Sequence, residues 1–271
     1  MTSTYPLLLS LHDLQLKEQE TSKAELAWVL SKVLPRCLAS LRDTLAECQE
    51  LLQPREPGVV LPLSSVRSEA LKGFIRRVGT QIVKSEMQIK IQGLIRGQLY
   101  KISLSPGDTI TINQLAMAQS LIEVTLEQLS MKIDLSNSST ALGHIDTLLS
   151  NLKLACNSLK TPSPAELFPQ TSINHELDQI FSPPLPSHVS VNIHICEAAI
   201  ITEIRTLVLH DERPKNGEGG MASKLGLIRI NPNAQDDVYE FEGGYARVVD
   251  RVRVESQDPN IISLSAKLAG V

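Results

Sequence analysis

Residues 142–159, LGHIDTLLSNLKLACNSL, carry the most regular apolar pattern of the chain. Successive apolar positions are 3, 4, 3, 4 and 3 residues apart: Leu142, Ile145, Leu149, Leu152, Cys156 and Leu159. This spacing is typical of a helix that packs by knobs-into-holes against other helices. The run covers fewer than three heptads, so it predicts a short bundle better than a long coiled coil. We interpret the six positions as a structural heptad that faces the core, with a seat for a partner helix as the alternative.

Helical periodicity recurs on both sides of this segment. Between residues 22 and 53, leucines spaced by three and four predict a first helix, which Pro35 should kink or break and Pro54 should end. A second stripe begins near Asn113 and continues to Leu129. Asp258 and Pro259 form an N-cap and first-turn pair, which predicts a last helix over 259–269.

Strand patterns lie between the helices. Residues 59–104 are rich in Val and Ile and are broken by glycines, and in 83–91 apolar residues alternate with Lys, Glu and Gln. Period two is typical of a half-buried strand, so we expect an antiparallel meander of three or four strands. Alternation resumes at 189–195, and residues 199–209 are expected to form its hairpin partner. Further strands are expected at 225–230 and 245–254.

The order of these elements predicts an α+β fold with two lobes. Helix stripes and sheet faces must both find apolar partners. We therefore expect an antiparallel leucine-rich helical bundle from residues 1–56, 110–162 and 257–271. Residues 57–109 and 163–256 should form an antiparallel β-rich domain, so that both lobes are built from discontinuous segments.

Composition indicates a soluble intracellular protein. The chain has 271 residues, 42% of them hydrophobic, and no segment approaches the ~20 apolar residues of a membrane helix. The apolar stretch at residues 5–11 is short and has no basic residue before it, so we expect a terminal arm rather than a signal peptide. The four cysteines suit buried free thiols in a reducing compartment. We expect a cytoplasmic protein.

No catalytic motif stands out in the sequence. It lacks a phosphate-binding loop, a nucleophile elbow and a zinc-protease helix motif. His194 and Cys196 share one side of a predicted strand, but no second ligand pair has metal-site spacing. We therefore expect a non-enzymatic protein without a cofactor or a metal site, and a buried or edge histidine at 194.

The strongest local charge is basic. Residues 67–101 contain eight basic and two acidic residues, although the whole chain has a net charge of −4. Four of the basic residues form a candidate interaction surface: Arg76, Arg77, Lys84 and Lys90. The segment is either the solvated face of a sheet or a docking surface for an acidic protein, anionic lipid or RNA. No nucleic acid is expected, because only Phe74 and Tyr100 could stack on bases.

Several segments, in order, resemble the Rogdi leucine-zipper family. They are Leu26-Ala27-Trp28-Val29-Leu30, Leu71-Lys72-Gly73, the Thr161-Pro162 helix stop, and Phe181-Ser182-Pro183-Pro184-Leu185-Pro186-Ser187 running into Val189-Ser190-Val191-Asn192-Ile193. The resemblance spans roughly residues 22–269. The predicted last helix, 259–269, is short beside its companions, which leaves room for a partner helix as the alternative to a closed bundle. In the family this helix runs further, so the resemblance implies that the fourth bundle helix is truncated here.

This resemblance implies a function as well as a fold. The family includes the small subunit of the RAVE complex, which regulates the vacuolar and endosomal proton ATPase. It implies a non-catalytic subunit that promotes assembly of this ATPase. The implied partners are a large WD-repeat RAVE-type subunit and peripheral-sector ATPase subunits. The implied location is the cytoplasm, with transient recruitment to vacuolar or endosomal membranes.

Overall fold

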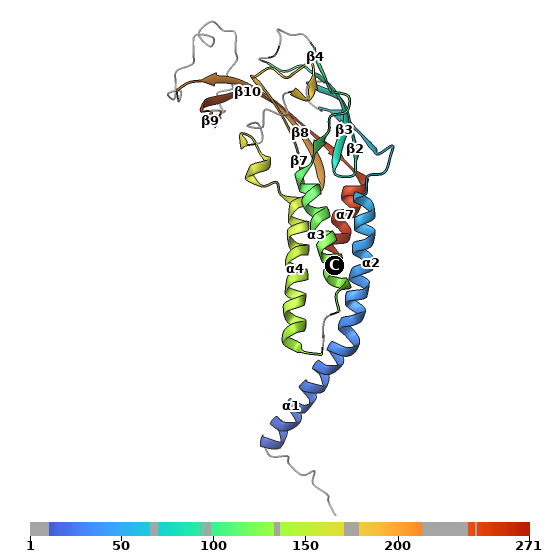
Figure 1. The fold of residues 1–271 in the computed structure, drawn as a ribbon. Coiled ribbons are helices and arrows are strands. Elements are labelled where there is room, and N and C mark those ends of the chain that lie inside the picture. The colour runs from blue at the N-terminus through green and yellow to red at the C-terminus, as the bar shows by residue number, and fades with distance from the viewer. Residues whose placement is uncertain are drawn as a thin grey trace, which may run out of the picture.

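A computed structural model describes residues 11–65, 70–92, 94, 99–132, 136–170, 179–212, 238–241 and 243–271. Helices and strands separate in space: the helices form a bundle, and the two sheets lie together at one end of it (Figure 1). Both parts draw on segments that are far apart in the sequence. The predicted α+β fold is confirmed.

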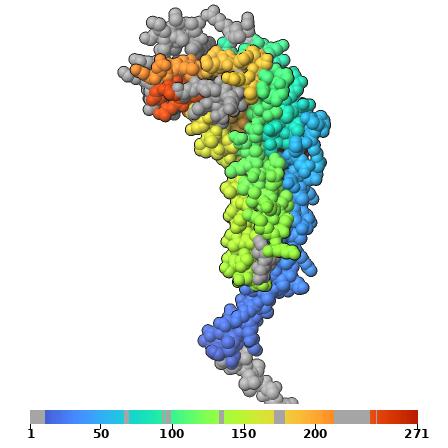
Figure 2. Space-filling view, viewed as in Figure 1, coloured from blue at the N-terminus to red at the C-terminus, as the bar shows by residue number. Residues whose placement is uncertain are grey.

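The first helical segment is one long rod. It consists of α1 (Leu11–Trp28), a π-helical turn η1 (Val29–Val33) and α2 (Leu34–Leu52). Pro35 lies at the start of α2, where its missing N–H and its ring are accommodated by the π turn before it. The helix begins at Leu11 rather than at residue 22, because nothing in the polar sequence of α1 interrupts it. No residue of α1 is buried, and it projects alone beyond the bundle (Figure 2).

Three more helices complete the bundle. They are α3 (Asn113–Ser130), α4 (Ser138–Lys160) and the short α7 (Pro259–Ala269). Helices α2 and α4 run toward the sheets, whereas α3 and α7 run away from them (Figure 1). Helices α3 and α7 each contact both α2 and α4, so α2 and α4 lie diagonally across the bundle.

Sheet A continues the chain after α2. Its strands are β1 (Val59–Ser64), β2 (Leu71–Val78), β3 (Gln81–Ile89) and β4 (Tyr100–Leu104), in this order, with β6 (Phe181–Ser182) beside β4 and β5 (Ile110–Thr111) beside β3. All pairs are antiparallel, which confirms the predicted meander. Gly79 turns β2 into β3 with φ of +59°, a left-handed conformation that favours glycine.

Sheet B has the order β7-β8-β10-β9. Strands β7 (Val189–Cys196) and β8 (Ala199–His210) form the expected hairpin, and β9 (Val238–Phe241) pairs with β10 (Gly244–Gln257). β10 contacts β1 of sheet A and then enters α7 directly. The predicted loop at 211–223 and the strand at 225–230 lie largely or wholly outside the described residues.

One apolar core joins the bundle to the sheets. It includes Leu52 of α2, Leu115 of α3, Ile75 of sheet A and Ile204 of sheet B, all at most 1% exposed. Gln114, at the start of α3, strengthens the junction, because its side-chain amide donates to the carbonyls of Ser158 (2.7 Å) and Ile195 (2.8 Å). Burying an amide requires such partners, so this glutamine fixes the bundle against sheet B.

Candidate interaction surfaces

Sheet A presents a basic outer face. The register places Arg76 of β2 directly opposite Lys84 of β3, and Gln88 opposite both Lys72 and Lys101. Directly paired residues point to the same side of a sheet, so these four cations share one face. The acidic member of the face is Glu86, which lies 2.9 Å from Lys84 Nζ. The structure thus brings together two of the expected residues with two further lysines.

Like charges directly opposite each other are unfavourable in a sheet. Lys84 is partly compensated by Glu86 and by the ring of Phe74, whose centroid is 5.4 Å from Nζ. Arg76 is half-buried, and its Nε has no hydrogen-bond partner within the described chain. Lys90 is exposed just beyond the end of β3, where its backbone N–H donates to the carbonyl of Ala70. Binding by this face stays a prediction.

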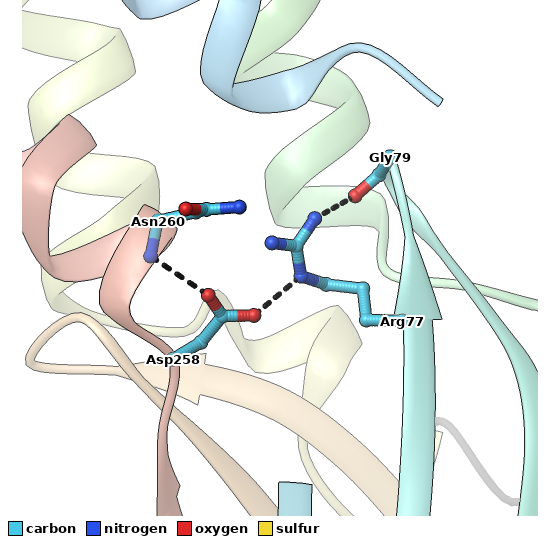
Figure 3. Close-up of polar contacts among 4 residues, drawn as sticks. All are labelled: Arg77, Gly79, Asp258 and Asn260. Carbon is cyan, nitrogen blue, oxygen red and sulfur yellow. Dashed lines mark hydrogen bonds and ion pairs between the residues drawn. The ribbon is translucent and has the colours of Figure 1, made fainter. Parts of the chain in front are cut away.

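Arg77 does not belong to this surface, and its assignment to it was wrong. Its side chain is 2% exposed and points inward, where Nε donates to Asp258 Oδ2 at 2.6 Å (Figure 3). A second guanidinium nitrogen donates to the carbonyl of Gly79. The sequence contained the signal for this placement, because Leu71, Ile75 and Arg77 alternate with Lys72 and Arg76.

Asp258 is fully buried and has two roles. It accepts the Arg77 bond, and its other oxygen accepts from the backbone N–H of Asn260 at 2.9 Å, which caps α7 as the sequence predicted (Figure 3). The ion pair therefore connects sheet A to the point where β10 becomes α7. Because one uncompensated charge in a buried site is strongly unfavourable, each side chain depends on the other.

The structural heptad is only partly buried. Leu152 and Leu159 lie in the core, and Ile145 and Cys156 are half-buried. Leu142 is 60% exposed and Leu149 is 44% exposed, so the expectation that they face the core was wrong. The buried stripe of α4 is displaced by about one residue and includes Ala141, Leu148, Leu152, Ala155 and Leu159. α4 lies between α3 and α7, and contact with α3 selects this stripe.

The face of sheet B opposite to core residue Ile204 carries a network of buried polar side chains, which the sequence did not indicate. Arg205 Nη2 pairs with Glu203 at 2.6 Å, and its guanidinium lies 4.9 Å from the ring centroid of Phe168. Glu203 and Arg205 are 6% and 8% exposed. His194 is buried as expected, and burial lowers the pKa of its imidazole below the usual value. Among the described residues, no cluster of three potential ligands could hold a metal ion.

All four cysteines are free thiols, as the sequence predicted. Cys48 is fully buried, and desolvation raises the pKa of its thiol to about 11, so it remains protonated and unreactive at neutral pH. Cys37, eleven residues earlier on the same rod, is exposed. The expectation that every cysteine is buried was therefore wrong at Cys37.

Within the described part of the chain, no helix has both the length and the apolar character needed to cross a bilayer.

Comparison with known proteins supports the family resemblance that the sequence segments indicated. No curated protein matches the chain. The model of one protein family, described as Rogdi leucine zipper containing protein, matches residues 25–271. This match covers the bundle, both sheets and α7, and leaves out most of the projecting helix α1. The chain therefore belongs to the Rogdi leucine zipper family.

Proposed function

We propose that this protein is a non-catalytic subunit of a RAVE-type complex that promotes assembly of the vacuolar or endosomal proton ATPase. The observation that carries the proposal is the family match over residues 25–271. The expected partners are a large WD-repeat subunit and peripheral-sector ATPase subunits. The protein would act in the cytoplasm, with transient recruitment to the organelle membrane.

A protein of this kind acts through differential binding. It can favour the joined ATPase sectors only by as much as its affinities for the joined and separated states differ. The long bundle and the β-rich end provide well-separated surfaces, which suits simultaneous contact with two partners (Figure 1). No catalytic group is needed for this role.

The test is deletion of the gene followed by fractionation of the cells. Peripheral ATPase subunits should remain present in normal amounts but leave the membrane fraction, and the organelle lumen should acidify poorly. Re-expression of the intact chain should restore both properties. Normal membrane attachment and normal acidification in the deletion strain would exclude the assembly role.

The basic outer face of sheet A supports a second candidate function, binding to an anionic membrane. The specific observation is the opposed pair Arg76 and Lys84 on an exposed sheet face. Phosphatidylserine vesicles should then retain the protein in a salt-sensitive manner, and the double change Arg76→Glu and Lys84→Glu should abolish retention. Reversal of Lys17 and Lys23 on α1 is the matched control. Equal retention on neutral vesicles, or preference for RNA, would exclude binding of an anionic membrane by the charge of this face.

A further inference from the structure

Strand β7 lies at one edge of sheet B, and half of its backbone groups point away from its neighbour β8. In an antiparallel pair, successive residues direct their N–H and C=O groups alternately toward the partner strand and away from it. His188, just before β7, accepts a hydrogen bond from the backbone N–H of Leu207 in β8, which fixes the phase of this alternation. The residues whose backbone groups point outward are therefore Val189, Val191, Ile193 and Ile195.

Both ends of this outer edge already have hydrogen-bond partners. The N–H of Ile195 donates to Gln114 Oε1 at 2.5 Å, and its carbonyl accepts from Gln114 Nε2 at 2.8 Å. The Gln114 amide thus pairs with β7 as a peptide group of a neighbouring strand would. At the other end, the N–H of Val189 donates to the carbonyl of Pro186 at 2.8 Å. Between them, the backbone groups of Val191 and Ile193 have no hydrogen-bond partner among the described residues.

A cavity of about 350 Å³ adjoins these unpaired groups. It lies where β7 meets β5, β6 and the first residues of α3, and its lining includes Val191 and Ile193. Val191 is 7% exposed. Backbone groups at this depth are nearly always hydrogen-bonded, so the cavity must supply their partner, either water or an inserted chain.

The alternation of β7 gives the cavity two chemically different sides. The side chains of Val191 and Ile193 lie on the core face of sheet B, beside lining residues that belong to the core or pack against it: Ile110, Ile112, Ile180 and Phe181. Asn192 lies on the opposite face, where its amide donates to the carbonyl of Glu166 at 3.0 Å. Glu166 and Gln170 also line the cavity. A strand placed beside β7 would therefore meet apolar side chains on one face and polar groups on the other.

We propose that the outer edge of β7 binds an extended segment of a partner protein, which adds an antiparallel strand to sheet B at Val191 and Ile193. A helix cannot use these backbone groups, because its own are paired internally. Since side chains alternate along a strand, the residues opposite Val191 and Ile193 should be apolar, and the residue between them should be Lys or Arg, which suits Glu166.

Strand addition of this kind takes affinity from main-chain hydrogen bonds and specificity from alternate side chains. The inference goes beyond the proposed assembly role and does not depend on it.

The test uses the full chain and a synthetic peptide of about five residues, Thr-Val-Lys-Val-Thr, roughly 17 Å long when extended. In the free protein, amide hydrogen exchange should be at least about tenfold faster at Val191 and Ile193 than at Asn192, whose N–H faces β8. Addition of the peptide should slow exchange at both positions and shift their amide resonances in a saturable manner.

Methylation of the peptide nitrogens tests the strand pairing directly. In the antiparallel arrangement, the N–H groups of both peptide valines face β7, and that of the central lysine faces away. N-methylation of either valine should therefore weaken binding at least about tenfold, whereas N-methylation of the lysine should change it less than about twofold. Replacing the lysine by glutamate should weaken binding by about two- to fivefold, as for exposed ion pairs.

A protein variant removes the donor from the other side. Ile193→Pro deletes an outward N–H on an edge strand, where proline is tolerated, and should abolish binding. Ile193→Val is the matched control, because it keeps the N–H. If Ile193→Pro does not fold, the methylated peptides decide the question. The proposal would be overturned by absence of saturable binding, by equal effects of methylation at all three positions, or by protected Val191 and Ile193 amides in the free protein, which would mean that the chain covers its own edge.

Discussion

Removing the Arg77 guanidinium should destabilise the protein far more than removing its neighbour. Arg77→Met leaves the Asp258 carboxylate fully buried, with the backbone N–H of Asn260 as its remaining donor. Breaking a buried ion pair from one side costs about 3–5 kcal/mol, a large part of the roughly 5–15 kcal/mol that stabilises an ordinary domain. Arg76→Met is the control, because Arg76 is half-buried on the opposite face, and its cost should stay below about 1 kcal/mol.

The pair can be isolated with a double-mutant cycle. Asp258→Ser keeps a side-chain oxygen for the cap of α7 but leaves the buried Arg77 charge without its carboxylate partner. It should therefore also cost about 3–5 kcal/mol of stability. The double variant buries neither charge. Its free energy of unfolding should therefore be at least about 3 kcal/mol higher than the sum of the two single effects implies. Urea unfolding followed by circular dichroism at neutral pH measures all four proteins. Additive single effects, or an unchanged Arg77→Met, would refute the energetic coupling of sheet A to α7.

Three other outcomes follow from burial. Burial lowers the pKa of His194 in the folded state, so the stabilisation that depends on neutral His194 should be fully present above about pH 6.5. This stabilisation should be lost as the pH falls toward the folded-state pKa, and His194→Gln should flatten the pH dependence measured by urea unfolding. Native alkylation followed by mass spectrometry should label Cys37 quickly and Cys48 only on unfolding. Leu152→Ala should cost about 2–4 kcal/mol, whereas Leu149→Ala should cost less than about 1 kcal/mol in thermal or urea unfolding.

Local features were predictable because their causes lie within a few residues. The 259–269 helix was placed correctly, since Asp258 and Pro259 form a cap that acts only on the first turn. The hairpin of β7 and β8 followed from alternation, which records the two faces of a strand. The start of the first helix was missed, because the apolar residues of α1, such as Leu14, Leu16 and Leu26, do not gather into one stripe.

The candidate surfaces were less predictable than the elements that carry them. Charge counting grouped Arg76 and Arg77, although their neighbouring positions in one strand send them to opposite faces of sheet A. The alternation along the strand predicts that Arg77 lies on the same face as Ile75 and Arg76 on the opposite face. The network of Glu203 and Arg205 gave no comparable signal, because its burial depends on what covers that side of sheet B, including Phe168.

The sequence by itself determined the family, the α+β class and most helices and strands, because periodicity, caps and turns express local stereochemistry. Only the tertiary structure decided which stripe of α4 is buried. The heptad pattern does not distinguish Leu149 from Leu152, but in the folded bundle Leu152 is 8% exposed and Leu149 is 44% exposed. Likewise, Arg77 and Asp258 are 181 positions apart, and no local pattern can record a contact made only when β2 and the start of α7 come together.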